Sequence, residues 1–232
     1  MSLPTKFITL ITQKIPATYE AGKQDEHIRF MDIYQDYGNR QTYNNAFNYW
    51  DERIFYPTCD IKPKTASSIF QGFNSLNSNG TVMNLIERLN ECGKSLDFSN
   101  TTGVLSYIFN NAKISHIPLC DFHNAGNLNA SFSRCSVEYI EKIIVDEGNT
   151  YQNSFDYCEN LTEVRFGGVI ASSISFKDSP LLTSDSVWSI INALKTLVST
   201  DSAQTLTLHS TVKGNLTTEQ EAEIYNKGWT LA

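Results

Sequence analysis

The stretches FNNAKISHIPL (residues 109–119), FSRCSVEYIEKIIV (132–145) and FDYCENLTEVRF (155–166) each begin with a phenylalanine and continue into an apolar segment. Their phenylalanines are equally spaced along the chain, and a shorter copy, FKDSPLL, follows at 176–182. A repeat unit as short as these is too small to bury an apolar face of its own, so each unit must stack on its neighbours. We therefore expect the phenylalanine rings of successive units to form one column inside the protein.

A tripeptide with apolar ends recurs once in each unit, at 96–98, 117–119, 143–145 and 164–166. Such alternation is the two-residue period of a strand whose outer residues face inward. Stacked units would place these strands side by side in a narrow parallel sheet. A repeat of about 20 to 29 residues is typical of leucine-rich solenoids. We predict an α/β fold of this class, a leucine-rich-repeat solenoid wound as a right-handed superhelix.

Three regions follow from the pattern. Residues 1–60 contain a predicted amphipathic helix (17–37) and an aromatic-rich passage, and we interpret them as an N-terminal helical cap. Residues 61–182 form the predicted solenoid. Residues 183–232 form a C-terminal α/β cap that is continuous with it.

The C-terminal region predicts the order helix, strand, helix, strand. Thr183 is a good N-cap before an apolar stripe at helical spacing. Residues 206–208 are expected to continue the column of strands, and 218–221 match a capping box that opens the second helix. Residues 229–231 are predicted to form the last strand.

The tripeptides are unequally spaced, and the longest interval precedes 143–145. Insertions in repeat proteins fall in surface loops. The segment HNAGNLN (123–129) has the composition of a loop, so we place the insertion there.

The cysteines are odd in number and include no CxxC pair, which argues against a disulfide framework and against a zinc site. Cys135 and Cys158 each lie three residues after a repeat phenylalanine, so they occupy equivalent positions. We predict buried structural thiols. The five are Cys59, Cys92, Cys120, Cys135 and Cys158.

Composition excludes some partners. The net charge is −7 and the pI is near 5.1, with no dense basic cluster, so nucleic acid is not an expected partner. Apolar runs are far shorter than the roughly 20 residues that cross a bilayer, which predicts no membrane span. The N-terminal segment MSLPTKFITLITQK lacks the small-residue cleavage pattern of a signal peptide.

No catalytic, cofactor-binding or metal-binding residue is predicted. The sequence contains no HExxH, GxSxG, P-loop or GxGxxG motif. None of the histidines, His27, His116, His123 and His209, has a partner at metal-ligand spacing. The prediction is a protein that is not an enzyme, although a glycosidase could still bring two distant carboxylates together in space.

The middle residues of the predicted strands would line one face, the one that such folds use for binding. They share no chemical theme. The candidate binding residues are Asp97, Pro118, Ile144 and Arg165. The aromatic passage at 43–56 has a second interpretation, as a platform on which carbohydrate stacks, but buried packing is the commoner use of such rings.

The phrase F-x-x-C-x-x-L-x-x-V, complete in Phe155, Cys158, Leu161 and Val164, resembles the BspA-type leucine-rich repeat of bacterial surface proteins. The segments YEAGKQDE, GNRQTYNNAF, FYPTCDIKP, SVWSIINAL and KGWTLA together resemble leucine-rich-repeat proteins encoded in prophage regions of gut Firmicutes. The resemblance implies a non-enzymatic part that contacts a bacterial surface. It also implies an extracellular or virion-associated location.

Two functions from different classes remain open. The first is a recognition module that binds a protein or glycan on a bacterial surface. The second is a structural spacer or capping subunit, whose partners would be neighbouring subunits of a virion-like assembly. A fragment of a cell-surface adhesin is a related option. No cofactor is expected in any of these, and the sequence leaves the oligomeric state open.

Overall fold

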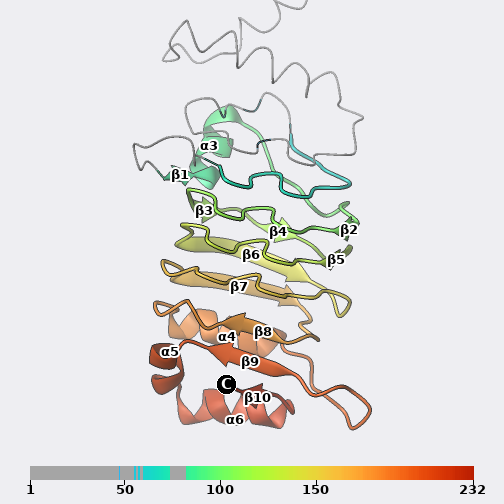
Figure 1. Ribbon diagram of the computed structural model, residues 1–232, viewed down its shortest axis with the longest axis vertical. Helices are drawn as coiled ribbons and strands as arrows, with labels where there is room; N and C mark the ends of the chain where they lie inside the picture. The colour runs from blue at the N-terminus through green and yellow to red at the C-terminus, as the bar shows by residue number, and fades with distance from the viewer. Residues whose placement is uncertain (1–46, 48–54, 56, 58–59, 74–81) are drawn as a thin grey trace, which may run out of the picture.

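The computed structural model describes residues 47, 55, 57, 60–73 and 82–232. The predicted helix 17–37 and most of the aromatic passage 43–56 lie outside these residues. The described part consists of short parallel strands stacked in layers from β1 to β10, with helices near the two ends of the stack (Figure 1).

The main sheet contains five parallel strands in the order β1-β3-β6-β4, with β7 also paired to β6. Both β3 and β4 pair with β6, one after the other, through His116↔Tyr139 and Cys120↔Ile143. Pro118 lies between them and has no N–H to donate, which accounts for the interruption. The strands are β1 (Met83–Asn84), β3 (Ile114–Ile117), β4 (Cys120–Asp121), β6 (Tyr139–Val145) and β7 (Glu163–Gly168).

Two smaller parallel sheets complete the strands. One pairs β2 with β5, and the other has the order β10-β9-β8. Their members are β2 (Gly103–Val104), β5 (Ala125–Asn127), β8 (Ile174–Phe176), β9 (Thr205–Leu208) and β10 (Thr230–Leu231).

The helices begin at residues that cap them. Asn84 accepts the Glu87 N–H at the start of α3 (Leu85–Cys92), and Thr183 accepts the Ser186 N–H at the start of α4 (Ser184–Ala193). A short α5 (Ser210–Gly214) precedes α6 (Thr218–Asn226). The order over 183–232 matches the predicted helix, strand, helix, strand, with α5 as one addition.

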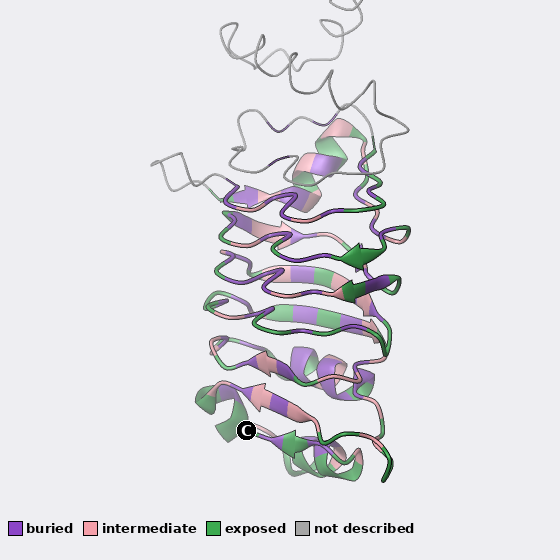
Figure 2. Ribbon diagram, turned by 45° about the vertical axis from the view of Figure 1, so that its right-hand side comes forward, coloured by how far each residue is buried: buried purple, intermediate pink, exposed green. Residues whose placement is uncertain are grey.

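A column of phenylalanine rings runs through the core, which confirms that expectation. Ring centroids of successive members are 5.3, 5.5, 5.2 and 4.6 Å apart, all in stacked geometry. Every ring is at most 2% exposed. Each layer thus contains buried residues that belong to one interior and exposed residues at the surface (Figure 2). The members are Phe70, Phe109, Phe132, Phe155 and Phe176.

The turn around each of the first four phenylalanines has one conformation. The residues two before and two after the ring have positive φ, as in Tyr107 (62°) and Asn111 (57°) around Phe109. Around Phe70, Phe109 and Phe132, the N–H groups at these positions and at the phenylalanine donate to carbonyls of the next layer, for example from Phe109 to Ser131 at 2.6 Å. A left-handed backbone costs a non-glycine residue about 1–2 kcal/mol. This ladder offsets part of that cost.

The prediction of a leucine-rich-repeat solenoid is wrong. The structure is a mixed α/β arrangement whose parallel strands form a curled sheet with few helices. Its strands divide among three sheets instead of one narrow sheet, and β9, expected to continue the column after β7, pairs with β8 and β10. The cause lies in α4. This helix packs beside β7, where Ser186 Oγ and Ser189 Oγ accept the N–H groups of Val164 and Phe166 at 3.0 and 2.8 Å.

Three local predictions also need correction. Ala125, within the predicted loop 123–129, begins β5. Leu119, expected to face inward, is 39% exposed because the strand ends before Pro118. The capping box begins one residue earlier than predicted, at Thr217. Its Oγ1 accepts the Gln220 N–H, and the Gln220 Oε1 accepts the Thr217 N–H.

Candidate functional site

A β-bulge in β6 organises the outward face of the main sheet. Across β6 and β7, Ile140 pairs with Val164 and Ile143 pairs with Phe166. Two residues of β6 therefore stand opposite the single residue Arg165. Such bulges bend a strand and re-aim its side chains, and they are common beside functional sites.

The two bulge residues, Glu141 and Lys142, are held in place by the neighbouring strands. Glu141 Oε2 accepts the Leu119 N–H at 3.1 Å, at the break between β3 and β4. The Lys142 stem lies over β7, because a Cβ on Gly167 would come within 2.7 Å of Lys142 Cε. The missing side chain of Gly167 therefore leaves room for the lysine.

A pocket of about 110 Å³ lies between β7 and the start of α4. Glu163 and Arg165 extend from β7, while Thr183, Asp185 and Ser186 come from the start of α4. We call these five residues the β7–α4 pocket.

The β7–α4 pocket places opposite charges together without pairing them. Glu163, Arg165 and Asp185 are exposed, and none makes an ion pair or side-chain hydrogen bond within the described residues. Their carboxylate oxygens accept hydrogen bonds and the guanidinium donates up to five, so both kinds of group are available to a ligand. Two carboxylates from different elements, Glu163 and Asp185, line this pocket, and a glycosidase also uses two carboxylates in one site.

An aromatic pair lies next to this pocket in the same sheet. The register aligns His116, Tyr139 and Glu163 across β3, β6 and β7. The His116 and Tyr139 rings have centroids 5.7 Å apart. A ring beside planar polar groups gives the face both apolar and hydrogen-bonding surface.

The four residues predicted as a binding face do not form one row. Ile144 pairs with Asp121 on one side and Gly167 on the other, so it is not aligned with Arg165. Pro118 lies in the break between β3 and β4. Of the four, only Arg165 lines the pocket.

Asp97, the fourth of these residues, belongs to a turn. Its Oδ1 accepts the Ser99 N–H at 2.9 Å. Hydrogen bonds from Ser99 lower the pKa of Asp97 below its ordinary value. Nothing in this geometry directs the carboxylate toward the β7–α4 pocket.

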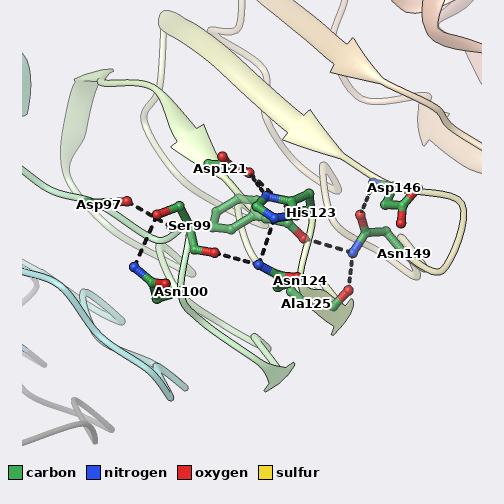
Figure 3. A network of polar contacts seen from close by, with 10 residues as sticks. Asp97, Ser99, Asn100, Asp121, His123, Asn124, Ala125, Asp146 and Asn149 are labelled. Atoms are coloured by element: carbon green, nitrogen blue, oxygen red, sulfur yellow. Dashed lines mark hydrogen bonds and ion pairs between the residues drawn. The ribbon is translucent and has the colours of Figure 1, made fainter.

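The same turn recurs at Asp121 in the next layer, and both turns belong to the polar network of Figure 3. Asp121 Oδ1 accepts the His123 N–H and contacts His123 Nδ1 at 2.6 Å. Asn124 Nδ2 donates to the Ser99 carbonyl of the preceding turn at 2.7 Å. These bonds tie adjacent layers together, so the network stabilises the stack.

The sequence reasoning missed this network, although a signal was present. The pattern D-x-x-N occurs at 97–100, 121–124 and 146–149. In the third copy Asn149 is buried, and its amide donates to the carbonyls of Phe122 and Ala125. No group of three or more potential metal ligands occurs among the described residues.

The cysteines described by the structure are free thiols. Cys120, Cys135 and Cys158 are buried, which confirms the prediction for these three, and Cys92 is half-buried. Burial raises the pKa of the Cys135 thiol to about 12 and that of Cys158 well above its ordinary value. Cys59 lies outside the described residues.

None of the helices in the described part of the chain has the length and hydropathy that a membrane span requires. Comparison with known proteins finds no matching family model, no matching curated protein and no matching solved structure.

Proposed function

We propose that the chain is a non-enzymatic recognition module that binds a glycan on a bacterial surface through the β7–α4 pocket. The observation that carries this proposal is the set of unpaired polar groups in that pocket, beside the Tyr139 ring. The resemblance to prophage-encoded proteins supplies the expected context, a virion or extracellular location.

The chemistry of the pocket favours a sugar over a peptide side chain. Vicinal hydroxyls can each donate to a carboxylate of Glu163 or Asp185 while accepting from Arg165. The arginine fork is planar, so it suits two adjacent acceptor atoms. A polypeptide side chain seldom offers several donors and acceptors so close together.

The size of the pocket limits how much of the ligand enters. A volume of about 110 Å³ equals roughly four water molecules at about 30 Å³ each. This is room for the edge of one sugar ring. The expected ligand is therefore a terminal or branching residue, with the rest of the glycan lying along the His116–Tyr139 pair.

The charge of the pocket and of the chain narrows the class of ligand further. The two carboxylates outnumber the single guanidinium in the pocket, and the chain as a whole carries a net charge of −7. Both facts oppose a polyanionic ligand such as a phosphate-rich polymer. The proposal is therefore a neutral glycan.

A glycan array probed with the purified protein tests this directly. We expect binding to neutral glycans that Arg165→Ala abolishes and Arg165→Lys weakens, because lysine lacks the planar fork. Glu159→Gln, an exposed carboxylate outside the pocket, is the matched control and should bind as wild type. Binding that survives Arg165→Ala and the pair Glu163→Gln, Asp185→Asn would contradict the proposal.

Mass analysis of the bound glycan separates recognition from hydrolysis. We expect the ligand to be recovered intact after prolonged incubation. Shortened products that disappear in Glu163→Gln would instead favour the glycosidase alternative.

A structural spacer remains the second candidate, because the continuous column of stacked rings gives a rigid body. Its partners would be neighbouring subunits of a virion-like assembly. Absence of glycan binding together with recovery of the chain in purified particles would favour this function.

A further inference from the structure

The residue two places after each of the first four column phenylalanines has a left-handed backbone. These positions hold Gly72, Asn111, Arg134 and Tyr157, with φ of 63°, 57°, 59° and 58°. Glycine adopts this conformation freely and asparagine does so readily, whereas it is unusual for a bulky side chain.

The backbone role of this position does not require a bulky residue. Gly72, Asn111 and Arg134 each donate their N–H to a carbonyl of the next layer, at 2.8, 2.9 and 2.8 Å. The hydrogen bond is the same whichever side chain is present. Arg134 and Tyr157 therefore occupy strained positions that glycine or asparagine would fill equally well, and observed strain of this kind points to a role for the side chains.

The two side chains form one exposed unit. The Arg134 guanidinium lies over the Tyr157 ring, 4.5 Å from its centroid, and Tyr157 is 50% exposed. We call this pair the Arg134–Tyr157 edge.

The guanidinium of Arg134 has no carboxylate partner among the described residues. Two acids of the following turns are engaged elsewhere, since Asp156 pairs with Lys177 at 3.6 Å and Asp178 accepts the Tyr157 N–H at 3.0 Å. Stacking uses the face of the guanidinium, so its in-plane N–H groups remain available.

We infer that the Arg134–Tyr157 edge is a docking surface for a protein segment that offers one carboxylate beside an apolar side chain. The carboxylate accepts two parallel hydrogen bonds from the arginine fork. The apolar group covers the open part of the tyrosine ring. Tyrosine and arginine are also the residue types that most often dominate binding energy at protein interfaces.

A densely acidic segment is a poorer partner than a single carboxylate. The net charge of −7 repels a run of negative charges, and only one guanidinium is present to oppose that field. Arg134 precedes β6 and Tyr157 lies between β6 and β7, whereas the β7–α4 pocket is lined by residues of β7 and of the start of α4. Binding here is independent of glycan binding.

A displayed library of random short peptides, selected on the purified full chain, tests the inference. Enriched peptides should share one Asp or Glu next to an aromatic or aliphatic residue. Synthetic copies should lose at least about tenfold in affinity for Arg134→Asn, since hydrogen bonds between charged groups are among the stronger ones. They should bind the control variant Tyr107→Asn as tightly as wild type, because this substitution also replaces a bulky residue with a left-handed backbone but lies outside the edge.

A thermal melt shows whether the pair is instead a structural support. The double variant Arg134→Asn, Tyr157→Asn should keep its Tm within about 3 °C, because relief of two strained residues offsets the lost stack. A larger fall in Tm assigns the pair to stability and overturns the inference. Enrichment of peptides without a carboxylate, no enrichment, or unchanged affinity in Arg134→Asn also overturns it.

Discussion

The ring of Phe132 stacks on the ring of Phe155 with centroids 5.2 Å apart and planes inclined by only 6°. Both rings are at most 2% exposed. Because Phe132 stacks on Phe109 as well as on Phe155, removing its ring should weaken the layers on both sides.

We expect Phe132→Ala to lower the free energy of unfolding by about 3–5 kcal/mol, because it loses buried apolar area and leaves a cavity between Phe109 and Phe155. Urea denaturation followed by circular dichroism measures this. Tyr225→Ala, at an aromatic residue of α6 that is 56% exposed, is the control and should change stability by about 0.5 kcal/mol or less. Equal losses in the two variants would contradict a stabilising column.

Ser186→Ala should cost about 1–3 kcal/mol, because it leaves the buried Val164 N–H without an acceptor at the edge of β7. Hydrogen exchange of the Val164 amide should accelerate in parallel. Ser199→Ala, at an exposed position after α4, provides the matched control. An unchanged exchange rate at Val164 would show that the helix does not close the sheet in this way.

Two neighbouring threonines should contribute differently to stability, because Thr217 belongs to the capping box and Thr218 does not. Thr217→Ala should destabilise the protein by about 0.5–2 kcal/mol, since its Oγ1 accepts the Gln220 N–H at 3.2 Å. Thr218→Ala changes the first residue of α6 and should have little effect. The reverse order in denaturant titrations would support the capping box that the sequence suggested at 218–221.

Asp97 gives a pH dependence with a definite sign. Hydrogen bonds from Ser99 hold the pKa of its carboxyl below the ordinary value. A lowered folded-state pKa contributes stability that is fully present above the unfolded-state pKa and is lost as pH falls through the folded-state pKa. Unfolding free energies between about pH 2 and 5 should therefore depend less steeply on pH in Asp97→Asn than in wild type.

The buried thiols should not react with alkylating reagents in the folded protein. Because burial raises the pKa of Cys135 to about 12, almost no thiolate exists near pH 8, and the side chain is also inaccessible. Mass spectrometry after iodoacetamide treatment should show Cys120, Cys135 and Cys158 unmodified until urea is added. Half-buried Cys92 should react first among these four. Rapid native labelling of Cys135 would show that the layers open readily.

The phenylalanine column could be predicted because ring spacing in the sequence reports directly on stacking. The membership of Phe70 in the column could not be predicted, because α3 and its flanking segments separate Phe70 from Phe109 and break the equal spacing. The left-handed turns were not predicted either, since Tyr107, Arg134 and Tyr157 are residue types that seldom adopt them.

The sheet could not be predicted from the tripeptides, because an apolar alternation specifies which residues face inward and not which strand lies alongside. Residues 206–208 show the same alternation as 164–166, yet α4 takes the place beside β7. In the β7–α4 pocket, Arg165 was named from its outward position. Glu163 and Asp185 were missed because their proximity depends on where α4 packs.

The hydrogen-bond ladder around the phenylalanines has a direction, since the N–H groups of one turn meet the carbonyls of the turn that follows it in sequence. After Phe155 the direction ends at a side chain, where the Asp178 carboxylate accepts the Tyr157 N–H. A side-chain oxygen thus takes the place of a main-chain carbonyl at the last left-handed turn, while the ring column continues one layer further to Phe176.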